Sequence, residues 1–309
     1  MIISASRRTD IPAFYADWFF RRLEEGFALV RHPMHPHRIS RVCLTPDVVD
    51  GFVFWTKNPA PMLGRLSHLK DHAYYFQCTL TAYGRDVEQN VPSKRDVVLP
   101  AFRELSRRLG PERVVWRYDP VFLSRTYTAE YHLRWFDALA ARLAPFTTTC
   151  VISFLDRYRD TERNMSGLGL RNALPETLEM LAERFAKIAR ARGLRLESCA
   201  ESMELERFGI GRARCVDAGR LGRIRGEVLN VGKDKNQRPA CGCAESIDIG
   251  AYGSCAHGCL YCYARAGKAL ERPEGRHEPD SPLLLGRVRE DDIITERPMR
   301  SCAVRQLTL

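Results

Sequence analysis

Short apolar runs alternate along the chain with longer stretches whose apolar positions recur every three to four residues. The short runs predict β-strands and the longer stretches predict amphipathic helices. Strands are predicted at residues 1–6, 51–57, 74–81, 113–123, 148–155 and 194–200. Helices are predicted between them, at residues 14–25, 61–70, 94–109, 129–143 and 175–191. This alternation is typical of βαβ units with a parallel sheet, so we expect an α/β fold in the form of a partial or full (β/α) barrel.

The alternation ends near residue 200, and this change divides the chain into four predicted parts. Residues 1–200 form the β/α barrel core, and 201–245 form a loop region that contains several cysteines. Residues 246–270 contain one more strand and a loop rich in cysteine. Residues 271–309 are rich in Pro, Arg and Glu and are expected to be a tail or a cover.

Polar residues follow several of the predicted strands. Ser6, Arg7 and Asp10 come after the first strand, Lys57 ends the second and Arg117 lies in the fourth. In α/β barrels the loops after the strands form the active face, so we expect these side chains at one site. Two ordinary explanations stay open. Asp10 can cap the next helix as part of a local ion pair, and Lys57 can be a solvated lysine at a strand end.

The composition is that of a globular chain, with 309 residues, 45% hydrophobic and 28% charged. The apolar run at the start is too short for a secretory signal and no run is long enough to span a membrane, so we expect a cytoplasmic location and no membrane partner. A net charge of +10 is compatible with nucleic acid as a partner. Arg greatly outnumbers Lys, however, and such a bias also arises from genomic base composition.

Eleven cysteines in a chain expected to be cytoplasmic indicate metal or redox chemistry rather than disulfides. Three of them, Cys255, Cys259 and Cys262, have the spacing C-x3-C-x2-C. Zinc normally needs four ligands, so it would require His257 or a distant cysteine as well. Three thiolates can instead hold three irons of a [4Fe–4S] cluster and leave the fourth iron open. The spacing favours the iron-sulfur cluster, with zinc and structural cysteines as the alternatives.

Further cysteines fall into two groups. One group follows the last predicted strand and has the four thiols that a second [4Fe–4S] cluster or a structural zinc requires: Cys199, Cys215, Cys241 and Cys243. We assign this group to an auxiliary cluster, although Cys199 and Cys215 can also be ordinary buried cysteines. The other group lies in apolar or terminal contexts and is expected to be structural: Cys43, Cys78, Cys150 and Cys302.

The cysteine loop resembles the signature of the radical S-adenosylmethionine (radical SAM) superfamily, because aromatic Tyr261 precedes the last cysteine. The stretch "GCLYCYAR" is similar to the spore photoproduct lyase branch. The resemblance implies a β/α barrel and a [4Fe–4S] cluster on the three-cysteine loop, with S-adenosylmethionine bound to the open iron. It also implies reductive cleavage to a 5′-deoxyadenosyl radical, with an electron donor such as flavodoxin or ferredoxin. Carried over by position, it places Tyr261 near the adenine, Lys57 at the carboxylate and Ser6 at the amino acid or ribose.

The position of this loop departs from the superfamily pattern, in which the loop follows the first barrel strand. Here "SASRRTDIPAFY", "FWTKNP" and "QCTLT" resemble later segments of the lyase branch, in order, but precede the loop. We therefore expect a circular permutation in which residues 246–254 are the displaced first strand and its connection to the loop. Nearly the whole chain also resembles an uncharacterised bacterial family, the domain of unknown function 1848.

Two other segments carry polar side chains suited to binding. In "RHPMHPHR", His32, His35 and His37 can bind zinc, but the prolines favour a solvated loop. "DKNQR", residues 234–238, is expected to line a substrate or cofactor pocket, with a solvated charged loop as the alternative.

The substrate is not fixed by the sequence. The resemblance and the charge point to a nucleic acid or nucleotide, and a lyase-type reaction would need a hydrogen-atom donor such as Cys78 or Cys150. Two other functions compete with the radical enzyme. They are an iron-sulfur electron-transfer or redox-sensing protein and a zinc-stabilised nucleic-acid-binding module.

Overall fold

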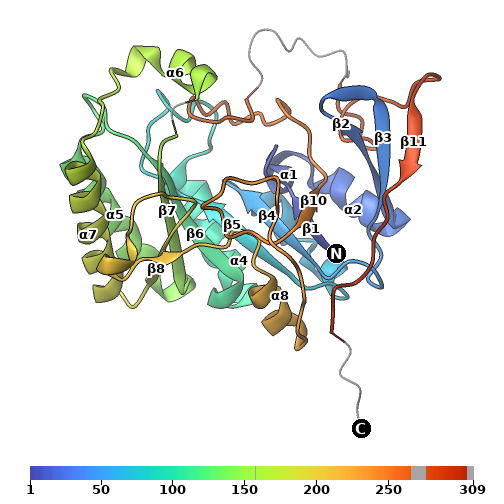
Figure 1. Cartoon of the computed structure of the whole chain (residues 1–309), viewed down its shortest axis with the longest axis horizontal. Helices are drawn as coiled ribbons and strands as arrows, with labels where there is room; N and C mark the ends of the chain where they lie inside the picture. Colours follow the sequence, from blue (N-terminus) through green and yellow to red (C-terminus); the bar gives the residue numbers. More distant parts are fainter. Residues whose placement is uncertain (157, 266–275, 305–309) are drawn as a thin grey trace.

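An eight-stranded sheet forms the body of the computed structural model, which describes residues 1–156, 158–265 and 276–304 (Figure 1). The spatial order is β10, β1, β4, β5, β6, β7, β8, β9, and every neighbouring pair is parallel. The strands are β1 (Ile2–Ala5), β4 (Gly51–Thr56), β5 (Tyr74–Thr79), β6 (Val114–Val121), β7 (Thr149–Phe154), β8 (Arg195–Ser198), β9 (Gly211–Arg212) and β10 (Ser246–Asp248).

Helices connect most of these strands. The α-helices are α1 (Ile11–Phe14), α2 (Ala16–Glu25), α3 (Ala60–Leu63), α4 (Leu99–Leu109), α5 (Ala129–Leu143), α6 (Arg159–Asn164), α7 (Pro175–Ala191) and α8 (Ala218–Arg225). A π-helical turn, η2 (Lys94–Val98), leads into α4. Short 3₁₀ turns occupy η1 (Leu66–Leu69), η3 (Pro111–Arg113), η4 (Ala144–Phe146), η5 (Ser166–Leu168) and η6 (Glu206–Phe208). The predicted helix at 14–25 is divided at Tyr15 into α1 and α2, and the one at 61–70 is α3 followed by η1.

Both faces of the sheet are apolar, as a parallel sheet covered on both sides requires. One face packs into the main core with side chains of α2, α4, α5 and α7, and its central residues are Ile3, Phe54, Phe76, Trp116 and Ile152. The other face packs against the segment between β9 and β10, and its central residues are Ile2, Val53, Tyr75, Val115 and Val151. The second face is therefore covered by the cysteine-bearing segment rather than by a layer of long helices.

The strand predicted to be displaced lies beside the first strand of the chain. β10 pairs with β1 in parallel, with Ile2 opposite Ser246 and Ser4 opposite Asp248. β10 and β9 lie at opposite ends of the sheet, and no pairing joins them in the described part of the chain. The α/β fold with a parallel sheet is confirmed, and the fully closed barrel is wrong for the described residues.

A second, three-stranded sheet was not predicted. β2 (Phe27–His32) and β3 (His35–Cys43) form a hairpin, and β11 (Ile293–Glu296) pairs with β3 in parallel, as the right-hand edge of Figure 1 shows. The predicted solvated loop at "RHPMHPHR" is thus the tip of this hairpin. The prolines conceal the strand pattern in the sequence, yet β3 accommodates Pro36 because it lies beside the register shift at the hairpin tip.

The last described segment returns to the first one. The Met1 ammonium group donates a hydrogen bond of 2.8 Å to the carbonyl of Arg300, and Trp18 donates one of 2.9 Å to the carbonyl of Ser281. None of the helices among the described residues has the length and apolarity needed to cross a bilayer.

Candidate functional site: a cysteine-lined cavity

A cavity of about 570 Å³ lies at the carboxyl end of the sheet. We call it the cysteine cavity because its lining includes both predicted sets of ligands: Cys199, Cys215, Cys241, Cys243, Cys255, Cys259 and Cys262. Ser6, Lys57 and Tyr261, the predicted S-adenosylmethionine contacts, also line it. The structure therefore brings together side chains that lie more than 250 residues apart in the sequence.

The loop after β10 is clamped by the segment that follows β5. The backbone N–H of Asn90 donates to the carbonyl of His257 (3.0 Å), and the N–H of Leu260 donates to the carbonyl of Val87 (2.9 Å). Gly258 has a φ of +67°, and a Cβ atom there would lie 3.2 Å from the side chains of both Gln89 and Asn90. The loop thus needs glycine at this position for conformation and for space.

Cys259 is buried, Cys255 and Cys262 are partly buried, and the last two face backbone N–H groups. The N–H of His257 points at Cys255, and the N–H groups of Ala264 and Arg265 point at Cys262. Burial raises the pKa of Cys255 to about 12 and that of Cys259 to about 11. Thiolates here need nearby positive charge, which bound metal supplies.

A buried carboxylate, Glu88, organises the polar groups beside Cys259. Lys57 donates to it at 2.7 Å and Thr81 at 2.8 Å, while Lys94 and the hydroxyl of Tyr261 also contact it. Burial opposes the charge on Lys57, but Glu88 outweighs this and raises the pKa of Lys57. Burial likewise opposes the charge on Glu88, and the two lysines reverse the effect and lower its pKa to about 2.

These charges have two consequences. Two ammonium groups share one carboxylate, so the group of Lys57, Lys94 and Glu88 carries one surplus positive charge next to the cysteine loop.

The alternative that Lys57 is a solvated lysine is wrong, because its side chain is only 12% exposed and is paired with Glu88. Its ammonium group also lies 5.4 Å from the centre of the Tyr261 ring, which is a cation–π distance. Sequence reasoning missed Glu88, which lies outside any predicted strand or helix.

Asp10 links the first strand's loop to the cysteine loop. One of its carboxylate oxygens accepts from the N–H of Ala13 and caps α1, as the helix-cap interpretation predicted. Its other oxygen accepts from Nε2 of His257 (2.8 Å) and from the N–H of Lys57 (2.7 Å). Nδ1 of His257 is buried without a hydrogen-bond partner, although the imidazole lines the cysteine cavity. This atom can interact with a group bound in the cavity.

Asp248, at the end of β10, holds the loop that follows β1. Ser6 donates to one of its oxygens (2.5 Å), and Ser4 and the N–H of Arg7 donate to the other (2.7 and 2.8 Å). A Cβ atom at Gly250 would lie 2.1 Å from Oγ of Ser6, so the chain requires glycine there. Ser6 thus uses its hydroxyl hydrogen within the protein. Asp248 was missed because its role depends on the pairing of β10 with β1.

The four cysteines of the second predicted set form a connected group. The sulfurs of Cys199 and Cys215 lie 3.3 Å apart, and the N–H of Val216 donates to Cys243 at 3.4 Å. Interaction with Cys243 lowers the pKa of Cys241 to about 7. Arg117 donates to the sulfur of Cys215 at 2.9 Å.

Arg117 is held in a buried network of its own. It donates to Asp119 at 2.6 and 3.1 Å and to the side-chain oxygen of Gln77 at 3.3 Å. Burial opposes its charge, but Asp119 more than compensates and raises the pKa of Arg117. The guanidinium group is therefore a permanent positive charge against the thiols.

The segment predicted to line a pocket reaches the cavity through Asn236, Gln237 and Arg238. Its first residue, Asp234, is buried and accepts a hydrogen bond from Arg7 at 3.3 Å. The alternative of a solvated loop is therefore wrong for Asp234, whereas Lys235, Asn236 and Arg238 are exposed.

Residues 2–264 match the family model described as Domain of unknown function (DUF1848). The chain belongs to this family. The matched region of the DUF1848 protein ends just after the cysteine loop and so includes all seven cysteines of the cavity. A comparison with curated proteins gave no match.

The remaining cysteines of the DUF1848 protein lie away from the cavity. Cys78 and Cys150 face the helix-covered core, and burial raises the pKa of each well above its usual value. This placement contradicts the hypothesis that either one donates a hydrogen atom to a substrate. Cys43 lies in β3, where its sulfur is 3.0 Å from the hydroxyl of Thr45, and Cys302 bonds through its N–H to Asp50.

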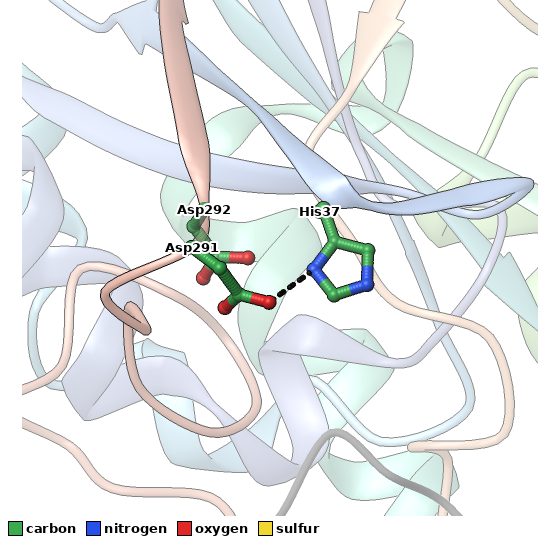
Figure 2. A group of neighbouring side chains, drawn as sticks. All are labelled: His37, Asp291 and Asp292. Atoms are coloured by element: carbon green, nitrogen blue, oxygen red, sulfur yellow. Dashed lines mark ion pairs between the residues drawn. The ribbon is translucent and has the colours of Figure 1, made fainter.

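The three histidines of the hairpin do not converge on one point. His37 pairs with Asp291 at 3.0 Å, as Figure 2 shows, whereas the rings of His32 and His35 pack on each other. Asp292 lies beside His37 and Asp291, but both of its oxygens accept from Arg31. The hairpin of the DUF1848 protein therefore does not form the three-histidine zinc site considered from the sequence.

Proposed function

We propose that this DUF1848 protein is a radical SAM enzyme. In this proposal Cys255, Cys259 and Cys262 hold a [4Fe–4S] cluster that binds S-adenosylmethionine. The observation that carries the proposal is the convergence of the three-cysteine loop, Lys57, Tyr261 and Ser6 on one cavity at the carboxyl end of a parallel sheet. The bound cluster would supply the electron that cleaves S-adenosylmethionine to a radical able to abstract hydrogen from a substrate.

The donor set fits a cluster with one open iron. Three sulfurs are available on one short loop, and the described N–H groups point at two of them. Hydrogen bonds to cysteine sulfur tune iron-sulfur potentials. The surplus positive charge of the Lys57, Lys94 and Glu88 group lies beside Cys259 and favours an anionic ligand set there.

The protein's own residues would position the ligand in distinct ways. Tyr261 is fixed at its hydroxyl by Glu88, so its ring keeps one orientation against the cavity. The Lys57 ammonium is already shared with Glu88, so a ligand carboxylate would bind the surplus charge of the whole group. Ser6 would contact a ligand through a lone pair, since it donates its hydrogen to Asp248.

The substrate class that this proposal favours is a nucleotide or nucleic acid. Arg7, Arg8 and Arg238 line the cavity, each beside an aspartate, and guanidinium groups are suited to binding phosphate. We place the reaction in the cytoplasm, because all eleven cysteines are free thiols and that compartment keeps thiols reduced.

The test uses protein purified and reconstituted with iron and sulfide under strictly anaerobic conditions. On addition of S-adenosylmethionine and either dithionite or reduced flavodoxin, we expect 5′-deoxyadenosine to form. The triple variant Cys255→Ala, Cys259→Ala, Cys262→Ala is expected to form none. Cys43→Ala, which removes a thiol outside the cavity, is the matched control and keeps the activity.

Two outcomes would replace this function. A protein that retains iron and sulfide but never cleaves S-adenosylmethionine would be an electron carrier or redox sensor. A protein that holds zinc without sulfide would instead be a zinc-stabilised module, and nucleic-acid binding would then be the property to measure.

A further inference from the structure

Four thiols outside the three-cysteine loop share a wall of the cysteine cavity: Cys199, Cys215, Cys241 and Cys243. They come from three different places in the chain, namely the ends of β8 and β9 and the segment before β10. Cys215, Cys241 and Cys243 are at most 6% exposed. Ordinary core cysteines are scattered among apolar side chains, whereas these thiols contact one another.

We propose that Cys199, Cys215, Cys241 and Cys243 bind a second [4Fe–4S] cluster, fully ligated by thiolates, on the wall of the same cavity. This site would differ from the first in having a cysteine for every iron, and so no open coordination position for a substrate. The proposal does not depend on S-adenosylmethionine chemistry.

The four sulfurs form a chain of contacts rather than a compact tetrahedron. Cys199 and Cys215 lie 3.3 Å apart, Cys243 contacts both Cys215 and Cys241, and among the described residues only His37, Asp291 and Asp292 have three ligand atoms mutually within 4.8 Å. Four thiolates on one tetrahedral zinc lie about 3.8 Å from one another, given a zinc–sulfur distance of about 2.3 Å. The choice between a cluster and a single zinc ion therefore depends on the metal and sulfide content measured below.

The charges around the four thiols also suit a cluster. A cube with four thiolate ligands is anionic, and a buried anion needs a fixed positive partner. Arg117 provides one, since its guanidinium group lies 2.9 Å from the sulfur of Cys215 and is oriented by Asp119 and Gln77. The backbone N–H of Val216 adds a hydrogen bond to Cys243.

The test is the iron, sulfide and zinc content of anaerobically reconstituted protein. We expect about eight irons and eight sulfides per chain in the wild type and about four of each in the Cys255→Ala, Cys259→Ala, Cys262→Ala variant. This variant leaves the second set intact, so its remaining iron reports on that set alone. After reduction it is expected to show the electron paramagnetic resonance signal of one [4Fe–4S] cluster.

A complementary variant, Cys241→Ala with Cys243→Ala, changes only the segment before β10. It is expected to hold about four irons, all of them bound by the three-cysteine loop. Cys43→Ala with Cys302→Ala removes two thiols outside the cavity and is expected to hold the wild-type amount.

The proposal is overturned if the three-cysteine variant holds no iron, or if it holds one zinc and no sulfide. A wild type with about four irons that disappear in the three-cysteine variant would leave the radical enzyme standing and remove the second cluster. If the proposed radical function is wrong instead, the wild type forms no 5′-deoxyadenosine, while the three-cysteine variant still holds about four irons on the second set. The two proposals can therefore fail separately.

Discussion

At the scale of single residues, Glu88 connects more of the site than any residue predicted from the sequence. It is 2% exposed and binds Lys57, Lys94, Thr81 and Tyr261. Its backbone forms an isolated antiparallel bridge with Cys259. One side chain therefore fixes a cavity aromatic ring, a cavity lysine and the loop that carries the thiols.

Replacing this carboxylate with an amide, Glu88→Gln, should destabilise the protein. Lys57 and Lys94 would then lie buried without a counter-charge, and breaking such a pair typically costs about 3 kcal/mol or more. We expect urea unfolding to show a loss of this size, together with weaker iron retention.

Glu104→Gln is the matched control, since this residue pairs with Arg108 on the exposed side of α4. Its unfolding midpoint should remain close to the wild type. An unchanged midpoint for Glu88→Gln would contradict the role assigned to Glu88.

A second residue, His132, makes stability depend on pH. It is fully buried, its ring nitrogens lie 2.9 Å from the hydroxyl of Tyr118 and 2.8 Å from the carbonyl of Phe122, and burial lowers its pKa from 6.5 to about 4. Between these values the unfolded chain takes up a proton that the folded chain does not. Stability from this residue is therefore complete above pH 6.5 and is lost as the pH falls toward 4.

We expect about 2 kcal/mol of this contribution to be lost between pH 7 and pH 5. His132→Gln should remove that part of the pH dependence, as measured by urea unfolding at the two pH values. His35→Gln, at the exposed tip of the hairpin, should keep the wild-type dependence. Equal slopes for His132→Gln and the wild type would show that His132 is not responsible.

At the scale of elements, β10 and the loop after it depend on a close fit to the loop after β1. Gly250 follows β10 by two residues and lies directly against Ser6. Asp248, at the end of β10, bonds to both Ser4 and Ser6. The edge strand and the first strand are thus joined by side chains as well as by backbone pairing.

Gly250→Ala should disturb this junction, because the new Cβ would meet the buried side chain of Ser6 at 2.1 Å. We expect a lower iron content at the three-cysteine loop and a lower thermal midpoint. Gly64→Ala adds a Cβ where no atom lies within 4 Å and should match the wild type in both measurements. Normal iron content in Gly250→Ala would show that the loop tolerates the shift.

Arg117 allows a test of the second set that does not remove a ligand. Arg117→Lys keeps a positive charge near Asp119 but loses the planar group that reaches Cys215 at 2.9 Å. Because hydrogen bonds to the sulfurs raise a cluster's reduction potential, we expect the potential of the proposed second cluster to fall. Redox titration measures this potential directly when Arg117→Lys is combined with the three-cysteine variant, and the surface change Arg192→Lys in the same variant is the control. Equal potentials with and without Arg117→Lys would contradict this contact.

Several elements could be predicted because their sequence patterns are local. Apolar runs predicted β1, β4, β5, β6, β7 and β8, and the cysteine motif directed attention to β10, which is only three residues long. The β2–β3 hairpin escaped prediction because its prolines and histidines give no alternation. Glu88 and Asp248 escaped because their roles arise from contacts between distant segments, with Ser4 and Asp248 lying 244 positions apart.

At the scale of the whole molecule, the two ends of the described chain lie close together. The Met1 ammonium group bonds to the carbonyl of Arg300, and the N–H of Cys302 bonds to Asp50. Both contacts lie near the amino end of β1, next to β10. The fold therefore does not require the chain to start at β1.

A rearranged chain should consequently fold. Its order would be 227–309, a short flexible linker and then 1–226, which places the cysteine loop ahead of β1. The new ends would lie between Gly226 and Glu227, which are both exposed. We expect the same far-ultraviolet circular dichroism and the same iron content as the native order, because proteins whose ends are adjacent tolerate such changes. A chain that folds but loses iron would show that the native order matters to the site.

The position of β10 at the edge of the sheet also has a consequence for biosynthesis. β10, the outer neighbour of β1, is made 244 positions after it, which corresponds to at least about 12 s of translation. Until then the edge of β1 has no partner and the cavity lacks one wall. Cys255, Cys259 and Cys262 leave the ribosome after all eight strands of the main sheet. A chain that stalls before them has no three-thiol loop, so unfinished copies cannot complete the cysteine cavity.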